Sequence, residues 1–141
     1  MILLDTNIVS ELAKPRPSPH VLAWLAGREA SLLYLSAITL GEIDMGARAH
    51  PDSARRAKLI DWCDGLQTHL FKNRILPFDA ATARMWGSIV SSAKDQGRSL
   101  EWRDSQIAST ALRFGTRLAT RNMRHFSGLG LDLVDPFVAP S

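Results

Sequence analysis

Residues 2–7 read ILLDTN, three large aliphatic side chains followed directly by an acid, a hydroxyl and an amide. A short apolar run of this kind is typical of a strand that is buried on both faces of a sheet. Asp5 then stands at the carboxyl end of that strand. Two interpretations are open: Asp5 ends the strand and caps the next helix, or it lies there because a metal ion binds at this position.

Strand-like and helix-like segments alternate along the rest of the chain. Strands are expected at residues 2–4, 32–35, 74–78, 117–120 and 131–134, and helices at 6–13, 19–26, 38–49, 52–70, 80–94 and 101–114. Parallel strands need crossover connections, which helices supply. The pattern therefore predicts an α/β fold in one domain, residues 1–141, with a mostly parallel sheet of about five strands and helices on both faces. Ligands of such sheets bind beyond the carboxyl ends of the strands, where Asp5 lies.

The composition is that of an ordinary globular domain, with 45% hydrophobic and 22% charged residues in a chain of 141. The single cysteine, Cys63, excludes an intramolecular disulfide and a multi-cysteine zinc site, and it suits a reducing cytosol. Asp5 interrupts the first apolar run too early for a secretory signal, and no run of about 18 apolar residues predicts a membrane span. We therefore expect a soluble, cytoplasmic protein that does not bind a membrane.

Positive charge is concentrated near the end of the chain, although the formal net charge is only +3. The stretch between Leu112 and Phe126 has no acid, and it holds His125 and four arginines, Arg113, Arg117, Arg121 and Arg124. Such a local excess predicts a patch that faces phosphate groups. A solvated face of ordinary surface arginines explains it as well, and the sequence leaves both open.

Glu42 stands out among the acids because of the helix face on which it lies. In the helix expected at 38–49 it shares a face with Ile38, Met45 and Ala49. Asp44 lies on another face and has an arginine four residues later, which is an ordinary surface pair. No basic residue is placed at helical spacing to face Glu42, so this acid points where apolar residues point.

The same comparison selects Asp104 in the helix expected at 101–114. It shares a face with Ile107, Ala108 and Ala111. Glu101 lies one turn earlier, but any acid is favoured at the start of a helix. Burying a lone carboxylate is costly, so an acid on an apolar face is usually paired or neutralised. Taken singly, each acid could be a cap or could simply reach water.

Taken together, Asp5, Glu42 and Asp104 converge at one edge if the sheet orders their strands as neighbours. Converging carboxylates without cysteine favour a hard divalent cation such as Mg²⁺ or Mn²⁺. Beside a basic patch that attracts nucleic acid, such an ion serves phosphodiester cleavage by water. The alternative is a receiver-like or other binding module that uses the acidic pocket for a partner peptide, without turnover.

Five segments, in this order, resemble the PIN-domain ribonucleases, and most of all the VapC-type toxins of bacterial toxin–antitoxin pairs: ILLDTN, YLSAITLGEI, RILPFDAATA, DSQIASTA and LATRNMRHF. The resemblance covers almost the whole chain. It implies a three-layer α/β/α fold and a metal-dependent endoribonuclease toxin. It also implies that Asp5, Glu42 and Asp104 are catalytic and hold Mg²⁺ or Mn²⁺, that the chain forms a homodimer, and that the tail of a cognate antitoxin enters the acidic groove.

The sequence departs from the family pattern at a fourth acidic position. Relatives usually carry Asp at the position of Asn122, of His125 or of both, so the departure leaves open whether one or two metal ions bind. We expect Asn122 to be auxiliary, together with Thr120, Thr6 and Arg121. Thr6 would bond a free N–H at the helix start or orient the preceding acid.

Two further features of the sequence have a structural and a functional interpretation. Trp102, two residues before Asp104, could stack on a nucleic-acid base, but we expect it to pack against the protein. The stripe of Trp62, Leu66 and Leu70 is expected to be core or dimer surface.

Overall fold

The structure of the chain is a computed structural model that describes residues 1–138. The strands are β1 (Ile2–Leu4), β2 (Leu33–Ser36), β3 (Ile75–Leu76), β4 (Arg117–Ala119) and β5 (Leu133–Val134). The helices are α1 (Thr6–Glu11), α2 (Pro19–Ala26), α3 (Ala37–Arg48), α4 (Ser53–Gly65), α5 (Ala80–Asp95), α6 (Trp102–Phe114) and α7 (Met123–Phe126), with a 3₁₀ turn η1 (Ala30–Leu32) and a π-helical turn η2 (Leu66–Leu70). Within these residues, none of the helices combines the length and the apolar character needed to cross a membrane.

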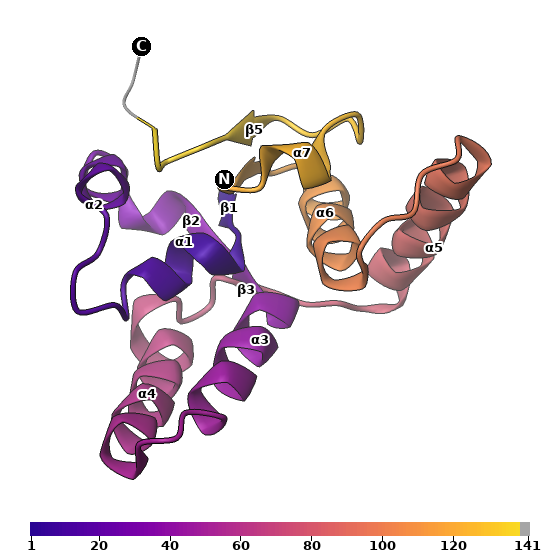
Figure 1. The fold of residues 1–141 in the computed structure, drawn as a ribbon. Helices are drawn as coiled ribbons and strands as arrows, with labels where there is room; N and C mark the ends of the chain where they lie inside the picture. The colour runs from indigo at the N-terminus through magenta and orange to yellow at the C-terminus, as the bar shows by residue number, and fades with distance from the viewer. Residues whose placement is uncertain (139–141) are drawn as a thin grey trace.

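The five strands form one parallel sheet in the order β3-β2-β1-β4-β5 (Figure 1). β1 is thus the central strand, although it comes first in the chain. The chain adds β2 and β3 on one side of β1, and then β4 and β5 on the other. The connections therefore diverge between β1 and β4, and such a switch point is where α/β sheets bind ligands. Asp5 directly follows β1 at this point, and Thr120 directly follows β4.

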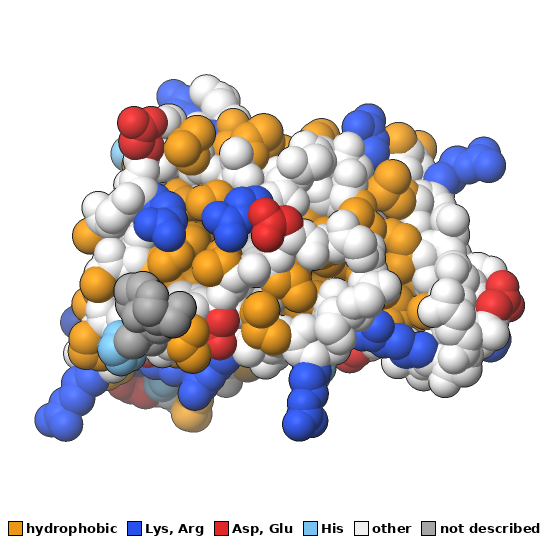
Figure 2. Space-filling model, turned by 90° about the horizontal axis from the view of Figure 1, so that it is seen from above, with side chains coloured by type: hydrophobic (Ala, Val, Ile, Leu, Met, Phe, Trp, Pro, Cys, Tyr) orange, Lys and Arg blue, Asp and Glu red, His pale blue; other side chains and the backbone are white. Residues whose placement is uncertain are grey.

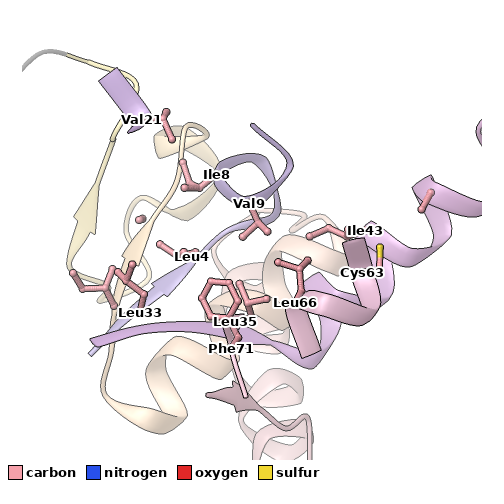
Figure 3. Close-up of a cluster of buried hydrophobic side chains, with 13 residues drawn as sticks. Leu4, Ile8, Val9, Val21, Leu33, Leu35, Ile43, Cys63, Leu66 and Phe71 are labelled. Atoms are coloured by element: carbon pink, nitrogen blue, oxygen red, sulfur yellow. The ribbon is translucent and has the colours of Figure 1, made fainter. Parts of the chain in front are cut away.

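Helices cover both faces of the sheet, because successive side chains of a strand point to opposite faces. Leu4 points into a cluster that contains Val9 of α1 and Ile43 of α3 (Figure 3). Leu3 points the other way and packs in a second cluster with Ile107 of α6. α5 lies against α6, on the side away from the sheet (Figure 1). The predicted three-layer α/β/α fold is confirmed.

Two segments differ from the expected elements. The strand expected at 74–78 is reduced to Ile75–Leu76, and the next residue, Pro77, has no N–H to donate to a neighbouring strand. The helix expected at 52–70 keeps α geometry only as far as Gly65 and continues as the π-helical turn η2.

The apolar stripe on α4 and η2 is divided between core and surface. Leu66 is fully buried and Cys63 is also in the core, while Leu70 is 55% exposed. Cys63 is therefore a packing residue. Trp102 packs against the ring of Trp86 as expected, but it remains 66% exposed. Its position on the first turn of α6 leaves one side of the ring to solvent.

Candidate active site

Asp5 lies at the end of β1 and is only 3% exposed. Its Oδ1 accepts a hydrogen bond from the backbone N–H of Thr6 over 2.7 Å, so Asp5 is the N-cap of α1. Its Oδ2 accepts a hydrogen bond from the hydroxyl of Thr120 over 2.7 Å. The side-chain amide of Asn7 approaches the same oxygen at 3.4 Å. The capping interpretation is therefore correct, and it leaves the carboxylate at the edge where the strands end.

The pKa of Asp5 is raised to about 6, chiefly because the side chain is buried, and the hydrogen bonds from Thr120 and Thr6 offset part of the rise. The negative charges of Asp104 and Glu42 also contribute to the raised pKa. The three carboxylates are thus close enough to repel one another. Within residues 1–138, no lysine or arginine forms an ion pair with Asp5. A buried acid with acidic neighbours and no cation is an unusual arrangement for a purely structural residue.

Thr6 connects Asp5 to Glu42. Its backbone N–H donates to Asp5, and its hydroxyl donates to Oε1 of Glu42 over 3.0 Å. The hydroxyl of Thr39 lies 3.1 Å from the same Thr6 hydroxyl. Burial raises the pKa of Glu42, and the hydrogen bond from Thr6 and the charge of Arg103 lower it. Two of the three predicted acids are therefore joined through Thr6, the first residue of α1.

The reason given above for selecting Glu42 is wrong in one respect. Met45 and Ala49, which were expected on the same apolar face, are both exposed, Met45 to 53%. The buried residues of α3 are Thr39, Ile43 and Ala47. Glu42 lies at the boundary of that face, and its cation comes from another helix: Nη1 of Arg103 is 3.7 Å from Oε2 of Glu42. Helical spacing within α3 could not have revealed this contact.

Asp104 lies in the first turn of α6, as predicted. Its backbone N–H donates to Oε2 of Glu101 over 2.9 Å, so Glu101 is the N-cap of the helix. Oδ2 of Asp104 lies 2.6 Å from Nδ1 of His125, and the ring nitrogen donates this hydrogen bond to the carboxylate. His125 follows β4 in the chain, and its contact with Asp104 places α7 over the start of α6.

The donor set fits a hard divalent cation by its chemistry. Within residues 1–138, no three acid, histidine or cysteine side chains already stand close enough to hold a metal ion between them. Asp5, Glu42 and Asp104 nevertheless repel one another, and of these three acids only Glu42 forms an ion pair with an arginine within residues 1–138. Carboxylate oxygens are the ligands that Mg²⁺ and Mn²⁺ prefer. These three residues are the ones that could hold such an ion.

The family model of the PIN domain matches residues 2–129 of the chain. The chain belongs to the PIN-domain family. It is 38% identical over 137 residues to the VapC ribonuclease Y4jK of Sinorhizobium fredii, covering 97% of this chain and 98% of that protein. It is 35% identical over 137 residues to the toxin FitB of Neisseria gonorrhoeae, covering 97% and 99%. A chain in the crystal structure of FitAcB from the same organism matches with a TM-score of 0.91 and 35% identity, covering 97% and 99%.

The four auxiliary residues predicted for this PIN domain fall into two pairs. Thr120 and Thr6 both donate hydrogen bonds to the acids, and Thr120 also accepts one from the backbone N–H of Asn122 over 3.0 Å. Arg121 instead lies over the ring of Phe137, with its guanidinium carbon 4.6 Å from the ring centroid. Asn122 is exposed and starts α7 without a side-chain capping bond. Neither Asn122 nor Arg121 has a side-chain hydrogen bond or ion pair to the three acids in the described part of this PIN domain.

The basic segment between Leu112 and Phe126 does not form a single patch. Arg117 pairs with Asp132 over 2.8 Å, and Arg113 lies over the ring of Phe114. The view of the PIN domain from above shows lysine and arginine side chains spread over the face and its edges, with apolar side chains between them (Figure 2). Of this segment, Arg124 and His125 line a cavity of about 280 Å³ that also contains Asp104.

Arg98 is a residue of this site that sequence reasoning missed. It lies between α5 and α6, and its guanidinium donates hydrogen bonds to the backbone oxygens of Arg124, His125 and Ser127. These contacts fasten α7 and the turn after it to the loop that precedes Asp104. Arg98 has no partner at helical spacing, so no signal in a single sequence could have identified it.

Proposed function

We propose that this PIN domain, a single domain over residues 1–141, is a Mg²⁺- or Mn²⁺-dependent endoribonuclease and the toxin of a toxin–antitoxin pair. The observation that carries the proposal is the buried carboxylate of Asp5, which lies near Glu42 and Asp104 and forms no ion pair within residues 1–138. A buried charge needs a counter-ion. The ribonuclease and the toxin named among its relatives support the same activity.

The residues around the acids have defined tasks in this proposal. A bound Mg²⁺ or Mn²⁺ would stabilise the charge that develops on the scissile phosphate. Thr6 and Thr120 orient Asp5, and their hydrogen bonds lower its pKa toward the ionised form that a cation requires. The hydroxyl of Thr6 holds Glu42 in the same way. His125 holds the carboxylate of Asp104 on the opposite side of the site.

Water is the proposed nucleophile in this reaction. The residues gathered at the edge of the sheet are carboxylates and threonine hydroxyls, with His125 already engaged by Asp104. Attack by the 2′-hydroxyl of RNA would call for a positioned general base and general acid, for which a pair of histidines is the usual choice. The cationic side chains of Arg98 and Arg124, which line the cavity beside Asp104, would attract the phosphate backbone of RNA.

A groove beside Glu42 is where we place the antitoxin. It has a volume of about 220 Å³ and lies between α1, α3 and α4, with apolar walls formed by Met45, Leu59 and Trp62. Glu42 and Arg103 also line it. A partner peptide with apolar side chains and a terminal cation would fill the groove and reach Glu42. We also propose that the chain forms a homodimer and acts in the cytoplasm.

RNA cleavage by the purified chain tests the function. The chain, freed of any bound partner, is incubated with cellular RNA in Mg²⁺, in Mn²⁺ and in EDTA, beside Asp104→Asn and a control, Asp61→Asn, which alters an exposed acid of α4. We expect divalent-ion-dependent cleavage by the wild type and the control, and its loss in Asp104→Asn. Equal background cleavage of RNA by wild type, Asp61→Asn and Asp104→Asn would contradict the proposal.

A binding module without turnover is the second candidate. The observation in its favour is that Asn122 and His125 stand where relatives usually carry the fourth acid. His125 also forms a hydrogen bond of 2.6 Å with the carboxylate of Asp104. In the same experiment, tight binding of an antitoxin peptide by wild type and Asp104→Asn, with no cleavage by either, would favour this candidate over the nuclease.

A further inference from the structure

Trp102 forms an exposed aromatic platform on the first turn of α6. It is 66% exposed, more than any other large hydrophobic residue of the described chain. Its ring lies against that of Trp86 of α5, with 4.9 Å between the ring centroids and a tilt of 53°. An apolar surface of this size is costly to leave in water, and tryptophan is enriched where proteins bind their partners.

The platform is held from behind by hydrogen bonds. The indole N–H of Trp86 donates to the hydroxyl of Ser105 over 2.9 Å, and that hydroxyl donates to the backbone oxygen of Trp102 over 2.8 Å. Ser105 itself is buried. Trp86 therefore has a fixed position, and Trp102 is backed on one face while the rest of its ring is open to solvent.

Trp102 also lines a cavity that continues into the candidate active site. This cavity, of about 410 Å³, contains Lys94 and Arg98 in addition to Trp102. It shares Arg98, Ser99 and Leu100 with the 280 Å³ cavity that contains Asp104 and His125. The two cavities meet at the loop before α6. Trp102 and Asp104 are two residues apart on one helix and so point to nearly opposite sides of it, about one helix diameter, roughly 10 Å, from each other.

We propose that Trp102 stacks on a nucleobase of single-stranded RNA, at a nucleotide that flanks the scissile phosphate. This inference rests on the proposed function and names a subsite for its substrate. Aromatic side chains next to cationic ones are the means by which proteins bind single strands, because every base has a π face and every nucleotide a phosphate. Lys94 and Arg98 supply the cations in the Trp102 cavity. The RNA backbone runs from there past Arg98 to Asp104.

A second copy of the chain is a poorer occupant for the same surface. Two-fold interfaces bring the same patch of both subunits together. Lys94 and Arg98 would then face their own copies, in a chain whose net charge is already +3. RNA instead brings negative charge to these side chains, so charge complementarity favours it.

Binding of short oligoribonucleotides in EDTA tests the inference separately from cleavage. The probes are a 12-nucleotide oligoadenylate and a ribose-phosphate chain of the same length without bases. Two variants change the platform: Trp102→Leu keeps apolar bulk against Trp86, and Trp102→Phe keeps an aromatic face. The control is Leu70→Ala, which removes another exposed apolar side chain. Affinity is measured by fluorescence titration, and folding by thermal unfolding.

We expect Trp102→Leu to weaken oligoadenylate binding by about fivefold or more, the lower range of base–aromatic stacking, without changing the affinity for the base-free chain. Trp102→Phe and Leu70→Ala are expected to bind both probes within about twofold of wild type. Quenching of tryptophan fluorescence by oligoadenylate should be largely lost in Trp102→Phe.

Equal weakening of both probes by Trp102→Leu, or no weakening of either, would overturn the inference. A second outcome would also overturn the inference: wild type forms a dimer in which acrylamide does not quench the fluorescence of Trp102, and Trp102→Leu is a monomer. A second copy of the chain would then cover this surface. Base-dependent binding by a protein that does not cleave RNA would retain the subsite and reject the nuclease.

Discussion

The hydroxyl of Thr120 donates to Oδ2 of Asp5 over 2.7 Å and so joins two residues that are 115 positions apart in the chain. Both residues are buried, and each directly follows one of the two strands between which the connections diverge. The hydrogen bond therefore forms only when β1 and β4 are paired. Its removal should lower the stability of the protein and raise the pKa of Asp5.

Thr120→Val should remove this hydrogen bond with little change of shape. Because the bond lowers the pKa of Asp5, we expect that pKa to rise above about 6 and the acidic limb of the pH–cleavage profile to move to higher pH. Loss of a hydrogen bond to a charged group should also cost about 1–3 kcal/mol of unfolding free energy. Thr120→Ser, which keeps the hydroxyl, is the control. A Val variant with the pH profile of wild type would show that the hydroxyl does not tune Asp5.

The ionised form of Asp5 should destabilise the metal-free protein. Burial raises its pKa from 3.8 to about 6 in the folded chain, so the folded state holds this proton more tightly than the unfolded state. The stabilising effect of that proton is fully present below about pH 4 and is lost as the pH rises through about 6. At neutral pH, a rise in the pKa of Asp5 from 3.8 to about 6 lowers the free energy of unfolding of the metal-free protein by roughly 3 kcal/mol.

We therefore expect Asp5→Asn to be more stable, relative to wild type in EDTA, at pH 8 than at pH 5. Chemical unfolding at both pH values measures the difference. Asp61→Asn, which changes an exposed acid of α4, should show no such pH-dependent gain. The same difference at both pH values would mean that Asp5 titrates normally.

A divalent cation should reverse this destabilisation. An ion that binds only the folded state raises its stability by mass action, by about 2.7 kcal/mol at 100 times the dissociation constant. We expect the melting temperature of wild type to rise with Mn²⁺ or Mg²⁺, and that of Asp5→Asn to change little. Ca²⁺ serves as a comparison ion. Equal shifts in wild type and Asp5→Asn would place the ion elsewhere on the protein.

Arg103→Gln should strengthen metal binding. Arg103 lies 3.7 Å from Glu42 and is about half exposed, so its charge competes with a cation only weakly. Its removal should lower the Mn²⁺ concentration needed for half-maximal stabilisation by about two- to fivefold. Arg113→Gln, which alters an arginine that lies over Phe114, should leave this concentration unchanged. A higher Mn²⁺ requirement in Arg103→Gln would mean that Arg103 supports the site.

Arg98→Lys should loosen α7. The planar guanidinium reaches the backbone oxygens of Arg124, His125 and Ser127, which a single ammonium group cannot serve equally well. We expect a loss of about 1–3 kcal/mol in unfolding free energy and faster amide hydrogen exchange in α7. Arg84→Lys, an exposed substitution on α5, is the matched control. Unchanged exchange in α7 would show that other contacts hold it.

The sequence was sufficient for the features that local patterns determine. The run before Asp5 predicts a buried strand, and the alternation of elements predicts the parallel sheet. The spacing of apolar residues selects Asp104 and Glu42, and in the structure both lie near Asp5. For Glu42 part of the reason was wrong, because Met45 is exposed.

The remaining features depend on contacts between distant segments, which periodicity does not reveal. His125 meets Asp104 only because α7 folds over the start of α6, and Arg103 reaches Glu42 from another helix. Trp102 was expected to pack against the protein; it contacts Trp86 of α5, and its place on the first turn of α6 leaves the rest of its ring exposed. Whether Asp5, Glu42 and Asp104 bind metal stays a prediction.

The central position of β1 also determines when the site can exist during synthesis. A chain is made from its N-terminus, so Asp5 leaves the ribosome before Asp104 and Thr120 do. Its partners arrive much later, because Asp104 lies on α6 and Thr120 follows β4, the strand that pairs with β1 on its second side. A growing chain that ends before residue 104 therefore contains Asp5 but no assembled site. The ribosome must add 115 residues after Asp5 to reach Thr120, and only then can the newly made chain hold Asp5 in place for any reaction with RNA.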